Sequence, residues 1–234
     1  MATALFPLYR NRLLSALSPA DVDLLQPNLK RVKLEIRKDL EAPNKPIEYV
    51  YFMEAGIASV VATSDRENVE VGLIGREGMS GLTIVLGNHR SPHSTYIQVA
   101  GQAQRISVVH IRFAMETSTS MRGLFMKFVQ AFMIQTAHTA IANARAKIEV
   151  RLARWILMAH DRIEHNRLPL THEFLALMLG VRRAGVTEAL HVLESQRLIK
   201  SSRGQVVVHN RKGLERSARN LYGIPEAEYR RLIG

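Results

Sequence analysis

The spacing of apolar residues along the chain changes its period twice. Residues 8–26, LYRNRLLSALSPADVDLLQ, have apolar residues at helical intervals, with Ser18 as a helix cap and Pro19 at the first helical position. From Val32 to Ile111 the pattern is that of short strands separated by Gly, Pro, Asn and Asp: VKLEI, YVYFM, IASVVA, VEVGLI, TYIQVA and QRISVV. Several short strands at this spacing predict an antiparallel sandwich or barrel rather than a parallel sheet.

A long helix is predicted after the polar residues TSTS at 117–120, which supply helix caps. One apolar stripe of this helix consists of Phe125, Phe128 and Phe132, and a second consists of Leu124, Ala131, Ile134 and Ile141. A helix that is apolar on two sides needs two partners. These are its own β-domain and the same helix in a second subunit, although burial inside a monomer would also satisfy both stripes. A further helix, RLARWILMAHDRIEH, is expected to run to about His165.

Residues 171–199, THEFLALMLGVRRAGVTEALHVLESQRLI, have the pattern of two helices around a tight turn. Thr171 is a good N-cap, and Gly180 stands where a turn between two helices needs a positive φ. The second helix is expected from about Arg182 to Ser195. Its buried stripe is Val186, Ala189, Leu190 and Leu193, and its outward face begins with Arg182, Arg183, Thr187 and Glu188.

After this helix, LIKSSRGQVVVHN predicts a strand, a basic turn and a second strand, which complete a winged helix-turn-helix. The second helix of such a domain fits the major groove of DNA, where arginine offers a bidentate fork to guanine. Lys200 and Arg203 on the wing would lie near the phosphate backbone. The residues expected to contact DNA are Thr171, His172, Arg182, Arg183, Gly185, Thr187, Glu188, Lys200 and Arg203.

Charge and composition agree with a DNA-binding protein. The net charge is +11, and from Arg145 onward the chain has 17 Lys and Arg against 9 Asp and Glu. A basic C-terminal part is typical of polyanion-binding domains, although a solvated basic surface would have the same composition. Cysteine is absent, which excludes disulfides, thiolate metal sites and catalytic thiols and suits a reducing cytoplasm. No membrane span is expected, and the N-terminus lacks the pattern of a secretory signal.

The order of these elements resembles the Crp/Fnr family of bacterial transcription regulators, most specifically in LGVRRAGVTEALHVLESQRLI. The resemblance covers nearly the whole chain and implies an α+β fold. Its parts would be a cyclic-nucleotide-binding-like sensor barrel of the jelly-roll type at 1–116, a dimerisation helix at 117–147 and a winged helix-turn-helix at 148–234. It also implies a homodimer on a palindromic operator in double-stranded DNA, with RNA polymerase as a candidate partner.

The resemblance also assigns roles within the recognition helix. By position, Arg183 matches the family's leading base-reading arginine. Ala184 stands where many members have glutamate, and Glu188 stands where the cyclic-AMP type has arginine. The expected DNA half-site therefore differs from that of the cyclic-AMP receptor.

A glycine-rich turn in IGREGMSGLTIVLG is similar to the family's phosphate-binding cassette. In that cassette a glycine–glutamate pair and an arginine–serine pair hold the nucleotide, but here Leu82 follows Gly81, and His93 and Ser94 replace the arginine and serine. A buried phosphate without its arginine costs several kcal/mol, and Arg90 could replace it only by moving a loop before Pro92. The degenerate pocket comprises Gly78, Ser80, Gly81, Leu82, Arg90, His93 and Ser94. We therefore expect a regulator that does not respond to cyclic AMP and whose effector is unknown.

Two other classes of function are weaker. His172 and Glu173 begin like the zinc-protease HExxH motif, but Ala176 leaves it incomplete. A metal could be held by His160, Asp161, Glu164 and His165, although an ion-paired helix face would have the same pattern. The chain has no catalytic constellation, so neither an enzyme nor a cofactor is expected. The alternative is a ligand-sensing or scaffold protein whose winged helix contacts a protein partner. Salt-dependent binding to duplex DNA would distinguish a DNA-binding regulator from this alternative.

Overall fold

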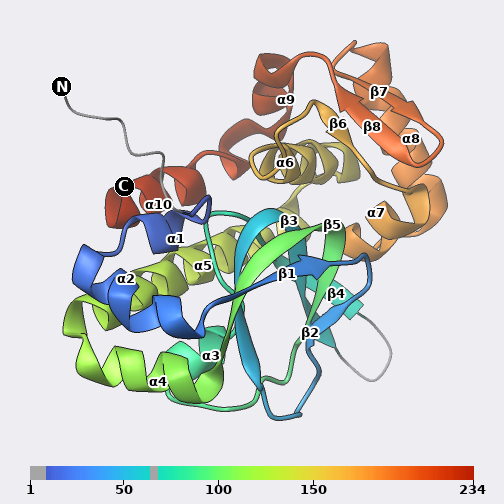
Figure 1. Cartoon of the computed structure of the whole chain (residues 1–234). Helices are drawn as coiled ribbons and strands as arrows, with labels where there is room; N and C mark the ends of the chain where they lie inside the picture. The colour runs from blue at the N-terminus through green and yellow to red at the C-terminus, as the bar shows by residue number, and fades with distance from the viewer. Residues whose placement is uncertain (1–8, 64–67) are drawn as a thin grey trace. The chain divides into compact units, whose positions relative to one another are not determined.

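A computed structural model describes residues 9–63 and 68–234, which form helices and antiparallel sheets (Figure 1). The helices are α1 (Arg12–Ser15), α2 (Pro19–Leu25), α3 (Leu82–Val85), α4 (Val108–Thr117), α5 (Thr119–Arg145), α6 (Ile148–His160), α7 (His172–Leu179), α8 (Arg183–Ser195), α9 (Arg211–Ala218) and α10 (Ile224–Ile233). The strands are β1 (Lys30–Leu34), β2 (Asp39–Glu41), β3 (Tyr49–Thr63), β4 (Asn68–Ile74), β5 (Ser94–Ser107), β6 (Arg167–Leu168), β7 (Ile199–Ser202) and β8 (Gln205–Val208). Short 3-10 turns follow α2 and α9. Residues 1–8, for which the sequence predicts no secretory signal, lie outside the described residues.

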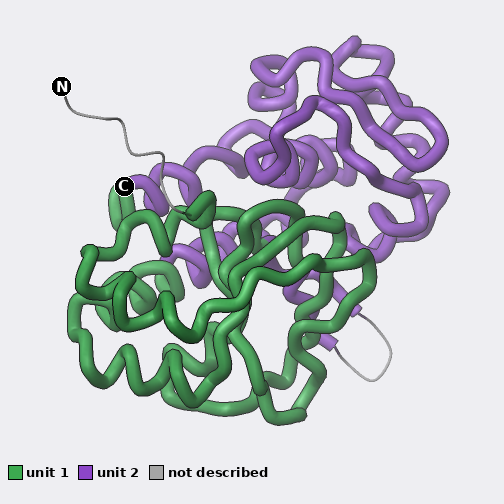
Figure 2. Tube along the Cα trace, viewed as in Figure 1, with its two compact units in different colours: residues 1–58, 74–130, 231–234 green, residues 59–73, 131–230 purple. Residues whose placement is uncertain are grey.

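The chain divides into two compact units, coloured separately in Figure 2. The first unit consists of residues 1–58, 74–130 and 231–234, and the second of residues 59–73 and 131–230. The second unit therefore contains the end of β3, most of β4, the C-terminal part of α5 and the predicted winged helix-turn-helix up to residue 230, while residues 231–234 belong to the first unit.

The larger sheet has the strand order β1-β5-β3-β4, and β2 pairs with β5 as well. The pairings β1–β5 and β2–β5 are antiparallel, and the first runs from Lys30 opposite Arg105 to Leu34 opposite Gly101. The antiparallel sheet agrees with the sequence prediction, but the described strands do not close into a barrel. The predicted barrel is thus corrected to an open sheet.

Two predicted strand breaks are instead places where strands approach closely. YVYFM and IASVVA are parts of the single strand β3, and TYIQVA and QRISVV are parts of β5. A Cβ atom on Gly56 would collide with the carbonyl oxygen of Val99, and one on Gly101 with that of Ala55. These glycines therefore allow two long strands to touch, which their sequence context does not distinguish from a turn.

Helix α4 was not predicted, because its β-branched start, Val108 and Val109, was assigned to the last strand. The hydroxyl of Ser107 caps the helix by accepting a hydrogen bond from the amide of His110. Ile111, Ala114 and Met115, at helical spacing, are buried. Burial of this face outweighs the strand propensity of the first residues.

The helical spacing predicted over residues 8–26 corresponds, within the described part from residue 9 onward, to the two short helices α1 and α2, and the long helix predicted after TSTS is α5. Ser18 caps α2 and Pro19 is its first residue, as expected. In α5 the stripe of Phe125, Phe128 and Phe132 is buried, and the rings of Phe52 and Phe125 lie 5.6 Å apart between centroids.

The second predicted stripe of α5 does not form a free face. Ala131 is buried within its own subunit, and of that stripe only Ile141 is well exposed. Helix α6 ends at His160, short of the predicted His165. None of the described helices is long and apolar enough to span a membrane.

Candidate nucleic-acid interface and glycine turn

The second unit contains two helices around a tight turn, as the sequence predicts. Thr171 caps α7, where its hydroxyl accepts a hydrogen bond of 3.1 Å from the amide of Phe174. Gly180 ends the helix with a φ of 59°, a conformation that favours glycine. Helix α8 begins at Arg183, with Arg182 in the N-cap position.

The two faces of α8 are also those predicted. Val186, Ala189, Leu190 and Leu193 are buried. The side chains of Arg182, Arg183 and Glu188 are exposed, whereas Thr187 and Gly185 are half-buried. The first turn of α8 thus presents two guanidinium groups to solvent, at the helix end that favours negative charge.

His172 has a structural role that the sequence did not reveal. Its Nδ1 atom lies 3.1 Å from the hydroxyl of Thr187 on α8, and its Nε2 atom lies 3.5 Å from the hydroxyl of Ser201 on β7. Three elements of the domain therefore meet at one imidazole ring. His172 and Thr187 thus join α7, α8 and β7, and their predicted contact with DNA stays a prediction.

A wing follows α8. Strands β7 and β8 are antiparallel, with Ile199 opposite Val208 and Ser202 opposite Gln205. Lys200 and Arg203 are exposed on this wing. Exposed cations on the first turn of one helix and on an adjacent wing can bind phosphate oxygens and base edges of DNA.

The possible metal cluster at the end of α6 is part of an ion-pair network. Arg211 donates hydrogen bonds to Asp161 Oδ1 at 2.7 Å and to His160 Nδ1 at 2.8 Å. The hydroxyl of Tyr222 donates to the other carboxylate oxygen of Asp161 at 2.7 Å. The cation Arg211 thus occupies the position between these ligands, and no group of three metal-binding side chains occurs among the described residues.

In the first unit, the glycine-rich turn uses its amide groups within the chain. The donors and their acceptors are Gly75 (Glu77 Oε1, 3.1 Å), Gly78 (Gly75 O, 2.9 Å), Ser80 (Tyr51 O, 3.0 Å) and Gly81 (Glu41 Oε1, 2.7 Å). An external anion would need these N–H groups free. The turn therefore has the shape of an anion-binding site but satisfies its own donors.

Glu41 occupies this turn, which no pattern in the sequence indicates. Its side chain is 7% exposed and accepts hydrogen bonds from the Gly81 amide and from the side chain of Thr95. Burial raises the pKa of its carboxyl group, and the two hydrogen bonds oppose that shift. Gly81 has a φ of 76°, and a Cβ atom there would lie 2.7 Å from Val50, so this close approach requires glycine.

The residues of the predicted ligand pocket differ in burial and in the groups that they contact. The ring of Phe128 lies so close to Gly78 that a Cβ atom there would be 2.6 Å from Cε2 of the ring. Ser80 is fully buried, and its hydroxyl accepts from the Tyr51 amide at 3.0 Å. Arg90 is exposed and donates from Nε to the ring of His89 at 2.9 Å. Leu82, His93 and Ser94 are half-buried.

Comparison with known proteins relates both units to one fold. Residues 150–217 match the model of the Crp-like helix-turn-helix domain. A transcriptional regulator of the Crp/Fnr family from Eubacterium rectale is 18% identical, with a TM-score of 0.68, and the match covers 89% of this chain and 98% of that one. For FixK2 from Bradyrhizobium japonicum the identity is 16%, the TM-score 0.69 and the coverage 80% and 96%. No curated relative matches by sequence.

A third similar structure is that of a global regulator. The global regulator CLP of Xanthomonas campestris, described as responsive to c-di-GMP, is 17% identical with a TM-score of 0.64, over 82% of this chain and 99% of that one. At these identities the likeness establishes the fold. The resemblance seen in the sequence is thus confirmed: the chain has the fold of the Crp/Fnr transcription regulators and carries a helix-turn-helix domain of the Crp type.

Proposed function

We propose that the protein is a homodimeric transcription regulator that binds palindromic sites in double-stranded DNA and does not respond to cyclic AMP or cyclic GMP. It would act in the cytoplasm, at promoters used by RNA polymerase, and without catalysis of its own. The observation that carries this proposal is the pair of exposed arginines, Arg182 and Arg183, at the start of α8 in a Crp-like domain.

The arrangement of cations suits DNA better than a protein partner. A guanidinium fork at the start of a recognition helix matches the O6 and N7 atoms of guanine. Lys200 and Arg203 on the wing can neutralise phosphates beside the groove. The apolar stripe of α8 from Val186 to Leu193 is buried in its own domain, and the start of the helix exposes the charged side chains of Arg182, Arg183 and Glu188.

Dimerisation is supported by an exposed stripe on α5. Its members are spaced alternately by four and three residues: Met126, Gln130, Met133, Ala137, Ala140 and Ala144. Met126 and Met133 are 45% and 64% exposed, which is unusual for large apolar side chains. The spacing is that of a coiled-coil seam, and the alanines allow two helices to approach closely. A second copy of the same helix is the partner that this symmetric pattern fits.

The lack of a response to cyclic nucleotides is supported by the contents of the glycine turn. Glu41 places a carboxylate on the Gly81 amide, and no arginine stands at His93. A phosphate entering this turn would face the acidic side chain and lose water without gaining a cationic partner.

Selection of bound sequences from a random pool of duplex DNA with the purified full chain tests the proposal. We expect a palindromic motif with half-sites about one helical turn apart, roughly 34 Å, and binding that weakens steeply with salt. Binding without sequence preference, or a monomer in light scattering at micromolar concentration, would contradict it. Absence of any DNA binding would favour the protein-partner alternative.

A further inference from the structure

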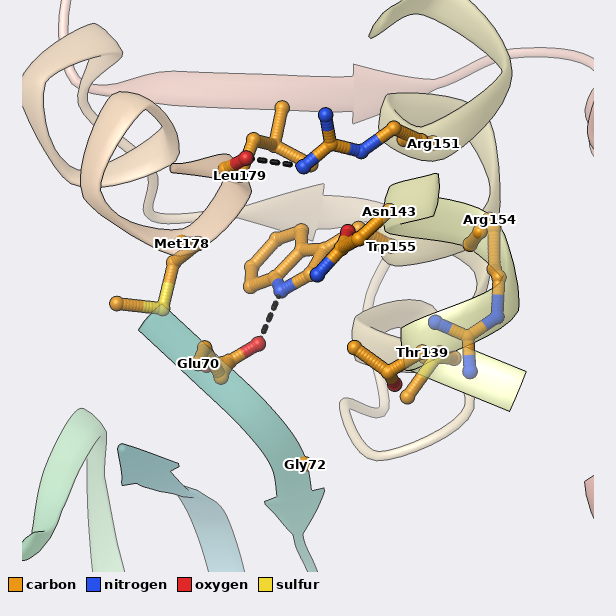
Figure 3. Close-up of a pocket in the computed structure, with 11 residues that line it drawn as sticks. Glu70, Gly72, Thr139, Asn143, Arg151, Arg154, Trp155, Met178 and Leu179 are labelled. Atoms are coloured by element: carbon orange, nitrogen blue, oxygen red, sulfur yellow. Dashed lines mark hydrogen bonds between the residues drawn. The ribbon is translucent and has the colours of Figure 1, made fainter. Parts of the chain in front are cut away.

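A buried carboxylate connects three elements of the second unit. Glu70 on β4 is 4% exposed, and its two oxygens accept hydrogen bonds of 2.6 Å each. One comes from the indole nitrogen of Trp155 on α6, which Figure 3 shows, and the other from the hydroxyl of Ser59 on β3. Trp155 in turn packs edge-on against Phe174 of α7, with centroids 6.1 Å apart. Glu70 therefore joins the strand pair β3–β4 to the helix-turn-helix domain.

The surroundings of Glu70 contain three arginines. Arg154 on α6 donates hydrogen bonds to the backbone oxygens of Leu221 and Gln135. Arg151 on α6 donates to the backbone oxygen of Leu179, and Arg162, just beyond α6, donates to that of Met158. Burial lowers the pKa of Arg154 to about 10, so that group keeps its positive charge at neutral pH. These hydrogen bonds from the three guanidinium groups all go to backbone carbonyls.

The other elements that line this region contribute uncharged groups. They are Thr139, Ala142 and Asn143 from α5 and Met178 and Leu179 from α7, around a cavity of about 20 Å³ that Glu70 also lines (Figure 3). A cavity of this size has room for about one water molecule. Complete burial of Glu70 raises the pKa of its carboxyl group to about 7, although the hydrogen bonds from Ser59 and Trp155 and the charges of Arg162 and Arg154 lower it.

The hydroxyl of Ser59 lies near acceptors on two different elements, and the charge of Glu70 decides whether its proton points to the carboxylate. Ser59 Oγ lies 2.6 Å from Glu70 Oε2 and 3.8 Å from the sulfur of Met178 on α7. An ionised Glu70 can only accept, so Ser59 donates its single proton to the carboxylate. When a proton from water neutralises Oε2, that oxygen becomes the donor to Ser59. The hydroxyl proton can then turn to the sulfur of Met178, a weak acceptor.

We propose that Glu70 and Ser59 form a proton-dependent switch that links strand β4 to α7, the first helix of the helix-turn-helix. In the neutral state a chain of donors runs from Glu70 through Ser59 to Met178. In the ionised state both donors point at Glu70, and a negative charge is buried. Because the neutral state holds α7 more firmly and carries no buried charge, the helix-turn-helix is better ordered below the midpoint of the titration. DNA affinity should accordingly be higher there.

Trp155 provides a direct measurement, because it is the single tryptophan of the chain. We expect its fluorescence in the full-length protein without DNA to titrate with a midpoint near pH 7. In Glu70→Gln the emission should be constant across this range, since glutamine can accept from the indole and donate to Ser59 without titrating. The chain also has nine histidines, which makes this variant the necessary control. A flat titration in the unmodified protein, or an equal one in Glu70→Gln, would overturn the switch.

The link to α7 is tested by Ser59→Ala and by operator affinity. Removal of one donor should move the Trp155 midpoint to higher pH, because the ionised carboxylate loses a hydrogen bond. From pH 8 to pH 6 the operator affinity of the unmodified protein should rise, and this rise should be at least about threefold larger than the rise measured for Glu70→Gln. That excess should vanish in Ser59→Ala, and its persistence there would contradict the role of Ser59. The operator measurement rests on the proposed function, whereas the emission of Trp155 does not. A protein that shows the Trp155 titration but binds no DNA would contradict the proposed function alone, and a protein that binds DNA without the titration would contradict the switch alone.

Discussion

The carboxylate of Glu41 accepts a hydrogen bond of 2.7 Å from the amide of Gly81, although the two residues are 40 positions apart. A carboxylate of the chain itself therefore lies where a glycine-rich turn could otherwise hold an external anion. Thr95 supplies a second hydrogen bond, so the acidic group is satisfied inside the first unit. The turn packs against the rest of the first unit, and its glycines allow close contact with neighbouring side chains, Gly78 with Phe128 and Gly81 with Val50.

Cyclic AMP and cyclic GMP should consequently show no binding at micromolar concentrations in calorimetry. The ligand's phosphate would have to displace Glu41 and would then meet His93 rather than an arginine. Operator affinity should be equal with and without either nucleotide. A heat of binding at micromolar concentration, or a gain in operator affinity, would show that the turn still accepts a phosphate.

Two substitutions of Glu41 should separate its charge from its hydrogen bonds. In Glu41→Gln the amide oxygen can accept from Gly81 and no charge is buried, so stability should be retained or increased. Glu41→Leu leaves the Gly81 amide and the Thr95 hydroxyl without this acceptor, which should cost about 1–3 kcal/mol for each buried group left unpaired. Urea unfolding measures both. Equal stability of the two variants would contradict the role assigned to these hydrogen bonds.

Arg183→Ala should weaken operator binding by about 1–3 kcal/mol and relax the preference at one base position, because a bidentate contact to guanine is lost. Arg203→Ala on the wing is the matched control. It should weaken binding to all sequences alike and reduce the slope of affinity against salt, as expected for a phosphate contact. An unchanged selected motif in Arg183→Ala would show that α8 docks differently.

Met133→Glu should convert the dimer to monomers, because two carboxylates would meet at the centre of the exposed stripe of α5. Lys127→Glu on the same helix introduces an acidic side chain outside the stripe and should leave the dimer intact. Light scattering at several concentrations distinguishes the two outcomes. Dimers that persist in Met133→Glu would place the interface elsewhere.

Glu70 should also make global stability depend on pH. The pKa of its carboxyl group is about 7 in the folded chain, against a usual value of 4.5. Between these values the folded state binds more protons than the unfolded state, so the free energy of unfolding should fall as pH rises from about 4.5 to about 7. Denaturant unfolding across this range should show the decline in the unmodified protein relative to Glu70→Gln. Parallel curves would mean that Glu70 titrates normally.

Much of the candidate DNA-binding site was predictable because its signals are local. The buried stripe from Val186 to Leu193 follows from helical periodicity, and Gly180 marks a turn that needs positive φ. The caps Ser18 and Thr171 act on amides three residues away. Each of these features depends on neighbours within about one turn of helix.

Other features depend on which distant residues pack together. Glu70 lies in the alternating strand VEVGLI, and only the fold places it against Trp155, 85 residues further on. Gly56 and Gly101 also depend on distant neighbours. The sequence pattern predicts strand breaks at both glycines, but in the fold they lie where β3 and β5 touch. Val108 and Val109 begin a helix because the face that includes Ile111 is buried, against their own propensity.

The sequence by itself thus determined the two helices of the helix-turn-helix and the exposed arginines at the start of α8, because periodicity and capping are encoded over a few residues. The tertiary structure alone decided the partners of Glu41, Glu70 and His172. A buried polar group must find its hydrogen bonds wherever packing places a donor or acceptor, and that choice has no local signature in the chain.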